Sequence, residues 1–261
     1  MNSRRARSRP PRSAAMVTPR AAKSTARALA ALSVFLFDAA PARACGVSAS
    51  GVASCSLAEH DDAVRPHWAV GISSLSTSTR LRFSGQLRAD QVRYATLATL
   101  AYLPTAKLVL QGGIGAAFGG SLTLPDGEYQ FSPGPVALVG ADFRAFDDGR
   151  YFLLLTSGMS LTTARTSAGG EWRENYLAFD IRLGAQFGVE LVRGVRPYVA
   201  GRVFGGPIFW RYENEAVTGT DTHHYQLGAG LAVRAWKGLN VFAEGIPLGE
   251  QAVALGVGLA F

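Results

Sequence analysis

The sequence predicts an all-β protein, a transmembrane antiparallel up-and-down β-barrel of about ten strands. Three observations predict it: the last eleven residues alternate large and small apolar side chains, segments of period two recur from Trp68 onward, and short turns alternate with longer polar connections. A strand between water and a core shows one polar face, whereas a strand between lipid and a crowded barrel interior does not. The final strand has no polar side chain after Gln251.

The charge of the chain is concentrated in its first 44 residues. This leader holds nine of the 26 basic residues and one of the 19 acidic residues, which leaves 17 basic and 18 acidic residues, a net charge of about −1, for the remainder. The formal charge of +7 therefore does not indicate a nucleic-acid partner, and none is expected.

The leader predicts a signal peptide over residues 1–44. A basic stretch precedes an apolar run over residues 28–37, and Ala42 and Ala44 form a small-x-small cleavage site before Cys45. The apolar run is too short to span a bilayer, which takes about 20 residues. We expect Met16 to be the true start. The alternatives are a disordered arginine-rich arm and a lipoprotein anchored at Cys45.

Residues 45–66 are expected to form a periplasmic segment ahead of the barrel. Cys45 and Cys55 are close in sequence and follow an export signal, so a disulfide is expected in an oxidising compartment. Metal ligation is the alternative, although two cysteines without spaced histidines make a poor zinc site. Ser56 and Glu59 match a capping box, which predicts a short helix ending near Val64, with plain loop as the alternative.

Residues 67–261 are expected to form the barrel. The ten strands are predicted near residues 67–75, 89–103, 106–118, 134–146, 150–163, 175–191, 196–206, 223–236, 239–247 and 251–261. Tight turns are expected at 104–105, 147–149, 193–195 and 237–238, and longer loops near 76–88, 119–133, 164–174 and 207–222. An even strand number with short turns at one end places both termini in the periplasm. Eight strands are the alternative if the first or ninth strand is wrongly assigned.

The predicted strands assign one face to lipid. In the strand at 175–191, alternate residues from Leu177 to Val189 are all apolar, and the opposite face carries Asp180, Arg182 and Gln186. A soluble β-sandwich, the alternative fold, would carry Lys, Glu and Thr on its outer faces. Aromatic residues near the strand ends fit interfacial girdles; they are Tyr94, Tyr102, Phe143, Tyr151 and Trp236.

The C-terminal segment adds a resemblance to a known class. Val253, Leu255 and Leu259 alternate with small residues, and the chain ends on Phe261. This segment resembles the closing strand of bacterial outer-membrane β-barrels. The resemblance implies an outer-membrane location, outer-membrane lipid as surroundings, and Phe261 as part of the signal recognised by the barrel-assembly machinery.

Charged residues on the inward faces predict a charge network in the lumen. They are Arg93, Lys107, Asp142, Arg144, Asp180, Arg182, Glu190, Arg202, Arg234 and Glu244. A barrel of about ten strands has little spare lumen, so these residues are expected to pair and fill it, with glycines such as Gly184 and Gly230 making room. The alternative is a narrow charge-selective pore.

Two polar connections carry candidate chemistry. Asp126 and Glu128 lie in one, and Asp221 and His223 lie in another, so that an acidic pair would face an Asp/His couple able to activate water. This arrangement resembles the omptin proteases, ten-stranded barrels with an acidic pair opposite an Asp-x-His motif, although Glu128 stands where that family has Asp. Asp-Gly is also ordinary turn chemistry. His223 and His224 as a metal site would lack further ligands.

Aromatic and arginine residues gather in two of the predicted loops. They are Trp172, Arg173, Phe209, Trp210, Arg211 and Tyr212. Such groups act as binding anchors or as interfacial girdle residues, and the girdle is the preferred interpretation. The sequence thus predicts a non-enzymatic surface structural or interaction protein without a cofactor, with small-solute passage as a variant. An omptin-like protease and a narrow channel are the alternatives.

Overall fold

The computed structural model describes residues 67–84, 87–170, 172–213, 215–236 and 238–261. The expected signal peptide, the Cys45–Cys55 disulfide and the helix expected over 56–64 lie outside these residues. Within the described part of the chain, no helix is long and apolar enough to cross a membrane.

The described chain forms one antiparallel sheet of 13 strands. The strands are β1 (His67–Phe83), β2 (Arg88–Leu103), β3 (Leu108–Leu124), β4 (Gly127–Phe131), β5 (Gly134–Asp147), β6 (Tyr151–Ser167), β7 (Trp172–Val189), β8 (Val195–Gly205), β9 (Ile208–Tyr212), β10 (Glu215–Asp221), β11 (Tyr225–Trp236), β12 (Leu239–Gly249) and β13 (Gln251–Ala260).

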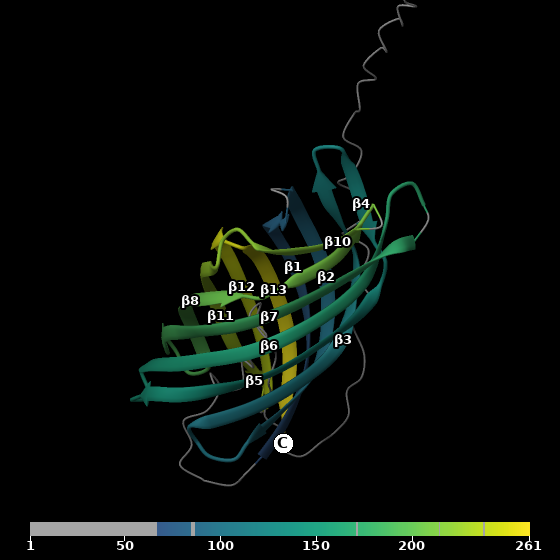
Figure 1. Ribbon diagram of the computed structural model, residues 1–261. Helices are drawn as coiled ribbons and strands as arrows, with labels where there is room; N and C mark the ends of the chain where they lie inside the picture. Colours follow the sequence, from purple (N-terminus) through teal and green to yellow (C-terminus); the bar gives the residue numbers. More distant parts are fainter. Residues whose placement is uncertain (1–66, 85–86, 171, 214, 237) are drawn as a thin grey trace, which may run out of the picture. The chain divides into compact units, whose positions relative to one another are not determined.

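Ten of these strands close into a barrel, which confirms the predicted fold (Figure 1). Each of β1, β2, β3, β5, β6, β7, β8, β11, β12 and β13 pairs antiparallel with the next. The ring closes where β13 pairs with β1, from Ala69↔Ala260 to Ser78↔Gln251. Trp68 and Phe261 exchange two backbone hydrogen bonds at this seam, so both ends of the barrel chain lie together. We call this end of the barrel the terminal end.

The other three strands extend the wall at the opposite end, which we call the hairpin end (Figure 1). There β4 lies between β3 and β6, and the β9–β10 hairpin lies between β7 and β1. With the far parts of β1, β2, β3, β6 and β7, these strands close a second ring of eight. The strand number therefore falls from ten to eight along the barrel axis.

The expected loops at 119–133 and 207–222 are therefore wrong, because both segments contain β-hairpins. Gly119 and Gly120, with φ of +75° and +108°, do not end β3. They lie at a register shift opposite Arg93 and Ala95, as in a β-bulge, and the strand continues beyond them. The segments at 76–88 and 164–174 are also mostly strand, since β1 extends to Phe83 and β6 to Ser167.

The predicted face assignment of the ten-strand ring is confirmed. Ile114 on β3, Leu183 on β7 and Leu255 on β13 point outward and are 72%, 54% and 50% exposed. Their inward neighbours, such as Gln186 and Ala254, are buried. Trp68 and Tyr102 pack at 4.6 Å between ring centroids near the terminal end, as interfacial aromatic residues do.

Candidate functional site

The lumen of the ten-strand ring contains a buried ion pair between β8 and β12. Both terminal nitrogens of Arg202 donate to the carboxylate of Glu244 at 2.8 Å, and the hydroxyl of Tyr198 donates to it at 2.8 Å. The side chains of Arg202 and Glu244 are 1% and 0% exposed. Such a pair is stable in low dielectric only when it is well hydrogen-bonded; here three bonds reach the carboxylate, while Nε of Arg202 has no partner among the described residues.

Glycines on neighbouring strands make room for this ion pair. A Cβ at Gly184 would lie 2.5 Å from Cγ of Arg202, and a Cβ at Gly230 would lie 2.3 Å from the ring of Tyr198. Any larger residue at either position would displace the side chains that meet at Glu244.

A second charge cluster lies nearer the hairpin end. Arg182 on β7 pairs with Asp180 and, at 3.1 Å, with Glu250 in the β12–β13 turn. Gln226 donates to the same oxygen of Glu250 at 2.5 Å. Arg182 lies in register with Phe204, two residues closer to the hairpin end than Arg202. The two ion pairs therefore occupy successive levels of the lumen.

Two further charges face this second level. The carboxylate of Asp221 on β10 accepts a hydrogen bond from Thr79 at 2.8 Å. The guanidinium of Arg93 on β2 lies over the rings of Phe131 and Tyr176, at 5.2 and 5.4 Å from their centroids. Among the described residues, no carboxylate lies within salt-bridge distance of Arg93.

A third group of charges lies at the terminal end. Arg196 on β8 pairs with Glu190 through two nitrogens, and the backbone N–H of Gly194 donates to the same carboxylate at 2.9 Å. Arg144 pairs with Asp147 at 3.2 Å. Asp142, two residues before Arg144 on β5, is fully buried.

Two of the expected lumen charges are not in the lumen. Lys107 is exposed in the turn before β3, because residues 104–107 form the β2–β3 connection and the strand begins at Leu108. Arg234 is exposed at the terminal end of β11, next to a register shift between Arg234 and Trp236. Its register partner Asn240 is buried, so Arg234 is exposed because it lies at the rim of the inward face.

The predicted charge network lacked four participants, Arg196, Glu250, Asp147 and Asp221, although period two identifies the first two. Ala252 and Ala254 face inward, and Glu250 falls on the same face two residues earlier. Glu250 lies in the β12–β13 turn and continues the inward face of β13. Arg196 shares the inward face of β8 with Arg202.

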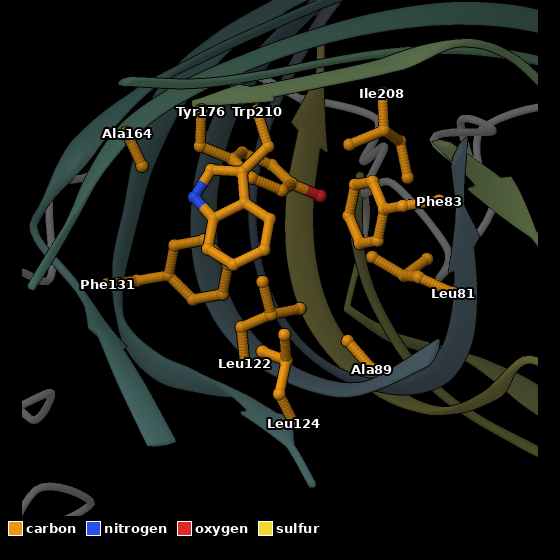
Figure 2. Close-up of a cluster of buried hydrophobic side chains, with 10 residues drawn as sticks. All are labelled: Leu81, Phe83, Ala89, Leu122, Leu124, Phe131, Ala164, Tyr176, Ile208 and Trp210. Carbon is orange, nitrogen blue, oxygen red and sulfur yellow. The ribbon is translucent and has the colours of Figure 1, made fainter. Parts of the chain in front are cut away.

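The eight-strand ring is filled by an apolar cluster (Figure 2). This outer apolar cluster consists of Leu81, Phe83, Ala89, Leu122, Leu124, Phe131, Ala164, Tyr176, Ile208 and Trp210. At its centre Trp210 packs 5.4 Å from Phe83, and its indole N–H donates to Thr166 at 3.0 Å. Trp210 is 2% exposed, so the expectation of a surface anchor or girdle residue is wrong for it. Phe209 beside it points outward.

The residues of the two omptin-like motifs contact different parts of the barrel. Asp126, at the tip of the β3–β4 hairpin, accepts a hydrogen bond from Tyr212. Asp221 faces the lumen, whereas His223 is exposed and packs 6.1 Å from the ring of Tyr225. Among the described residues, Asp126 and His223 share no hydrogen bond or ion pair, and no three His, Cys, Asp or Glu side chains gather as a metal ion would require.

Local contacts shift the pKa values of titratable groups at the two ends of the barrel. The hydrogen bond to Asp126 raises the pKa of Tyr212, and burial beside the same carboxylate raises the pKa of Tyr129. In the β5–β6 turn, the backbone N–H groups of Tyr151 and Arg150 donate to Asp148 and lower its pKa. These tyrosines stay protonated at neutral pH, and this aspartate stays ionised.

A cavity of about 140 Å³ lies inside the barrel. Its lining combines apolar side chains, such as Leu97 and Leu138, with the charged side chains of Asp180, Arg182 and Glu250. Tyr176 and Ile208 of the outer apolar cluster also line it. The lumen thus holds a cavity next to both charged and apolar groups.

No model of a known protein family matches this sequence, and no curated protein matches it significantly. Solved structures similar to it are β-barrels. The outer-membrane protease OmpT from Escherichia coli is 11% identical, with a TM-score of 0.47 over 78% of this chain and 98% of that one. The β domain of the Bordetella autotransporter BrkA is 15% identical, with a TM-score of 0.42 over 74% and 98%. The attachment invasion locus protein Ail of Yersinia pestis is 12% identical, with a TM-score of 0.36 over 76% and 99%.

Proposed function

We propose that this protein is a sealed outer-membrane β-barrel that acts at the cell surface as a structural or interaction protein, and that it is neither an enzyme nor an open channel. The observation that carries the proposal is the buried Arg202–Glu244 pair inside the lumen, whose side chains are 1% and 0% exposed. A water-filled pore would solvate both groups.

The outward faces support a membrane location. The ten-strand ring shows lipid-compatible residues such as Ile72 and Val139, which are 55% and 54% exposed. Beyond it, the hairpin end turns polar, and Arg80 and Asp90 pair at its surface. An apolar band below a polar extension is the pattern of a barrel that projects from the outer leaflet.

The remaining features follow from this location. The leader is proposed to be removed before Cys45, the terminal end to face the periplasm, and Phe261 to be recognised by the barrel-assembly machinery. The hairpin end, with exposed Arg211 and Glu215, then faces outward and supplies the interaction surface.

Planar-bilayer recordings test the sealed lumen. Purified protein is expected to be electrically silent, and a porin incorporated from the same detergent controls for insertion. Steady, charge-selective conductance from the wild-type barrel would move the protein to the channel class. Mass spectrometry of the outer-membrane fraction tests export: an N-terminus at Cys45 without acyl mass is expected, and an intact leader on protein recovered from the cytosol would contradict it.

A further inference from the structure

Among the described residues that line the lumen cavity, both basic and acidic side chains have atoms without a hydrogen-bond partner. Among the described residues, Nη2 of Arg93, Nη1 of Arg182 and Oδ1 of Asp180 are buried without a hydrogen-bond partner. All three residues line the cavity of about 140 Å³. Buried polar atoms are almost always satisfied, so three in one cavity point to a polar occupant.

Arg93 makes the strongest case for an anionic group. Arg182 already binds Asp180 and Glu250 directly, whereas Arg93 packs on the rings of Phe131 and Tyr176 and interacts with Glu250 only from beyond salt-bridge distance. A guanidinium in low dielectric is best satisfied by a carboxylate or phosphate. Among the described residues, the cavity therefore presents one cation with no carboxylate in direct contact and with Nη2 free of a hydrogen bond.

The charged residues that line the cavity also exclude a purely anionic occupant. Asp180, Asp221 and Glu250 line the cavity against Arg93 and Arg182, so its charged residues carry an excess of one negative charge. An added anion would double that excess and leave Oδ1 of Asp180 without a donor. A simple amine would supply that donor and leave both arginine nitrogens without an acceptor.

The apolar part of the cavity lining suits a short hydrocarbon. Leu97, Val136 and Leu138 are all buried and pack together with Ala117. The volume is close to that of the roughly 150 Å³ engineered cavity that takes one benzene. An occupant with a branched side chain of a few carbons matches this wall in size.

We infer that the cavity between the Arg202–Glu244 pair and the outer apolar cluster binds one small zwitterion, of the size and chemistry of an aliphatic α-amino acid. Its carboxylate bonds Arg93, its ammonium bonds Asp180, and its side chain packs on Leu138. Solvent reaches this wall, since the side chains of Asp180 and Arg182 are 16% and 18% exposed. The site goes beyond the proposed surface role, because a barrel that conducts no ions can still hold a ligand.

Titration calorimetry on the folded full-length barrel in detergent tests the inference with three probes. L-valine carries both charges, isobutylamine carries only the ammonium, and isobutyrate carries only the carboxylate. L-valine is expected to bind at least tenfold more tightly than either. No heat from L-valine, or equal binding of isobutylamine, overturns the inference.

Variants locate the site. R93M keeps an apolar side chain against the two rings and is expected to weaken L-valine binding roughly tenfold or more, whereas R80M at the exposed surface leaves it unchanged. Unchanged affinity in R93M refutes the assignment. If R93M fails to fold, NOEs from the methyls of labelled L-valine to Leu138 in the wild-type barrel decide, and their absence at saturation also refutes it.

Discussion

The substitution Arg202→Ala separates a filled lumen from an open one. It removes two hydrogen bonds of 2.8 Å and the only cation among the described residues that pairs with Glu244, which keeps the bond from Tyr198. Breaking a buried pair by removing one partner costs about 3–5 kcal/mol. With a urea dependence of about 1–3 kcal/mol per molar, the unfolding midpoint is expected to fall by roughly 1 M or more.

The assay is urea unfolding of the barrel in lipid vesicles, followed by tryptophan fluorescence and by heat-modifiable gel mobility. Arg80→Ala is the matched control, since Arg80 pairs with Asp90 at a surface where the two side chains are 58% and 64% exposed. Its midpoint is expected to equal that of the wild type. The double variant R202M/E244L removes both charges and is expected to recover much of the loss, because no orphaned carboxylate remains.

An Arg202→Ala midpoint equal to that of Arg80→Ala would refute the reasoning. It would mean that water solvates Glu244 in the variant without cost, as in an open pore. New leak current in the variant alone agrees with a sealed wild-type lumen.

Three further outcomes are expected. Deleting Phe261 removes an aromatic that contributes roughly 2 kcal/mol when buried, yet it should reduce the yield of folded, heat-modifiable barrel in cells more than the stability of refolded protein; an undiminished yield would contradict this. Trp210→Ala empties the centre of the outer apolar cluster and should cost about 3–5 kcal/mol in urea unfolding, while Phe209→Ala, on the outward face of the same strand, should cost much less. Asp148→Ala should narrow the difference in unfolding midpoint between about pH 7 and about pH 3: a carboxyl whose folded pKa is lowered contributes stability above its unfolded pKa and loses it as the pH falls through the folded value. An unchanged pH dependence would show that the turn bonds to Asp148 do not stabilise the fold.

The sequence identified the ten-strand ring because lipid imposes a strict period of two. A strand with lipid on one side and the lumen on the other needs apolar residues at alternate positions. Both β7 and β13 have this pattern, and both point the apolar residues outward as predicted. The inward position of Arg202 and Glu244 followed from the same alternation. Their pairing did not, since β8 and β12 are separated in the ring by β11 and nothing in the sequence states which inward charges share a level.

The strands of the hairpin end were not predicted, because the alternation is reversed there: polar residues point outward and apolar residues point inward. Outward residues such as Arg80 and Arg82 are polar, while inward Leu81 and Phe83 are apolar, which is the pattern of a soluble sheet and not of a lipid-facing strand. Gly119 and Gly120 had the composition of a turn. Their positive φ angles accompany a register shift, and beyond it Leu122 and Leu124 face inward. Positive φ at a glycine fits a turn and a bulge equally, so composition alone does not separate them.

The change from ten strands to eight explains why the lumen has two kinds of filling. The diameter of a barrel grows with its strand number, and about eight strands leave only enough room for side chains. The eight-strand ring is therefore narrow enough for Trp210, Phe83 and their neighbours to fill it with apolar contacts. The ten-strand ring is wider, and it is filled by long arginines whose charges need partners, such as Arg202 and Arg182. The cavity lies where one filling gives way to the other: Tyr176 and Ile208 bound it from the apolar side, and Arg182 and Glu250 from the charged side. A step in strand number thus produces, inside one barrel, a closed end and an amphipathic compartment beneath it.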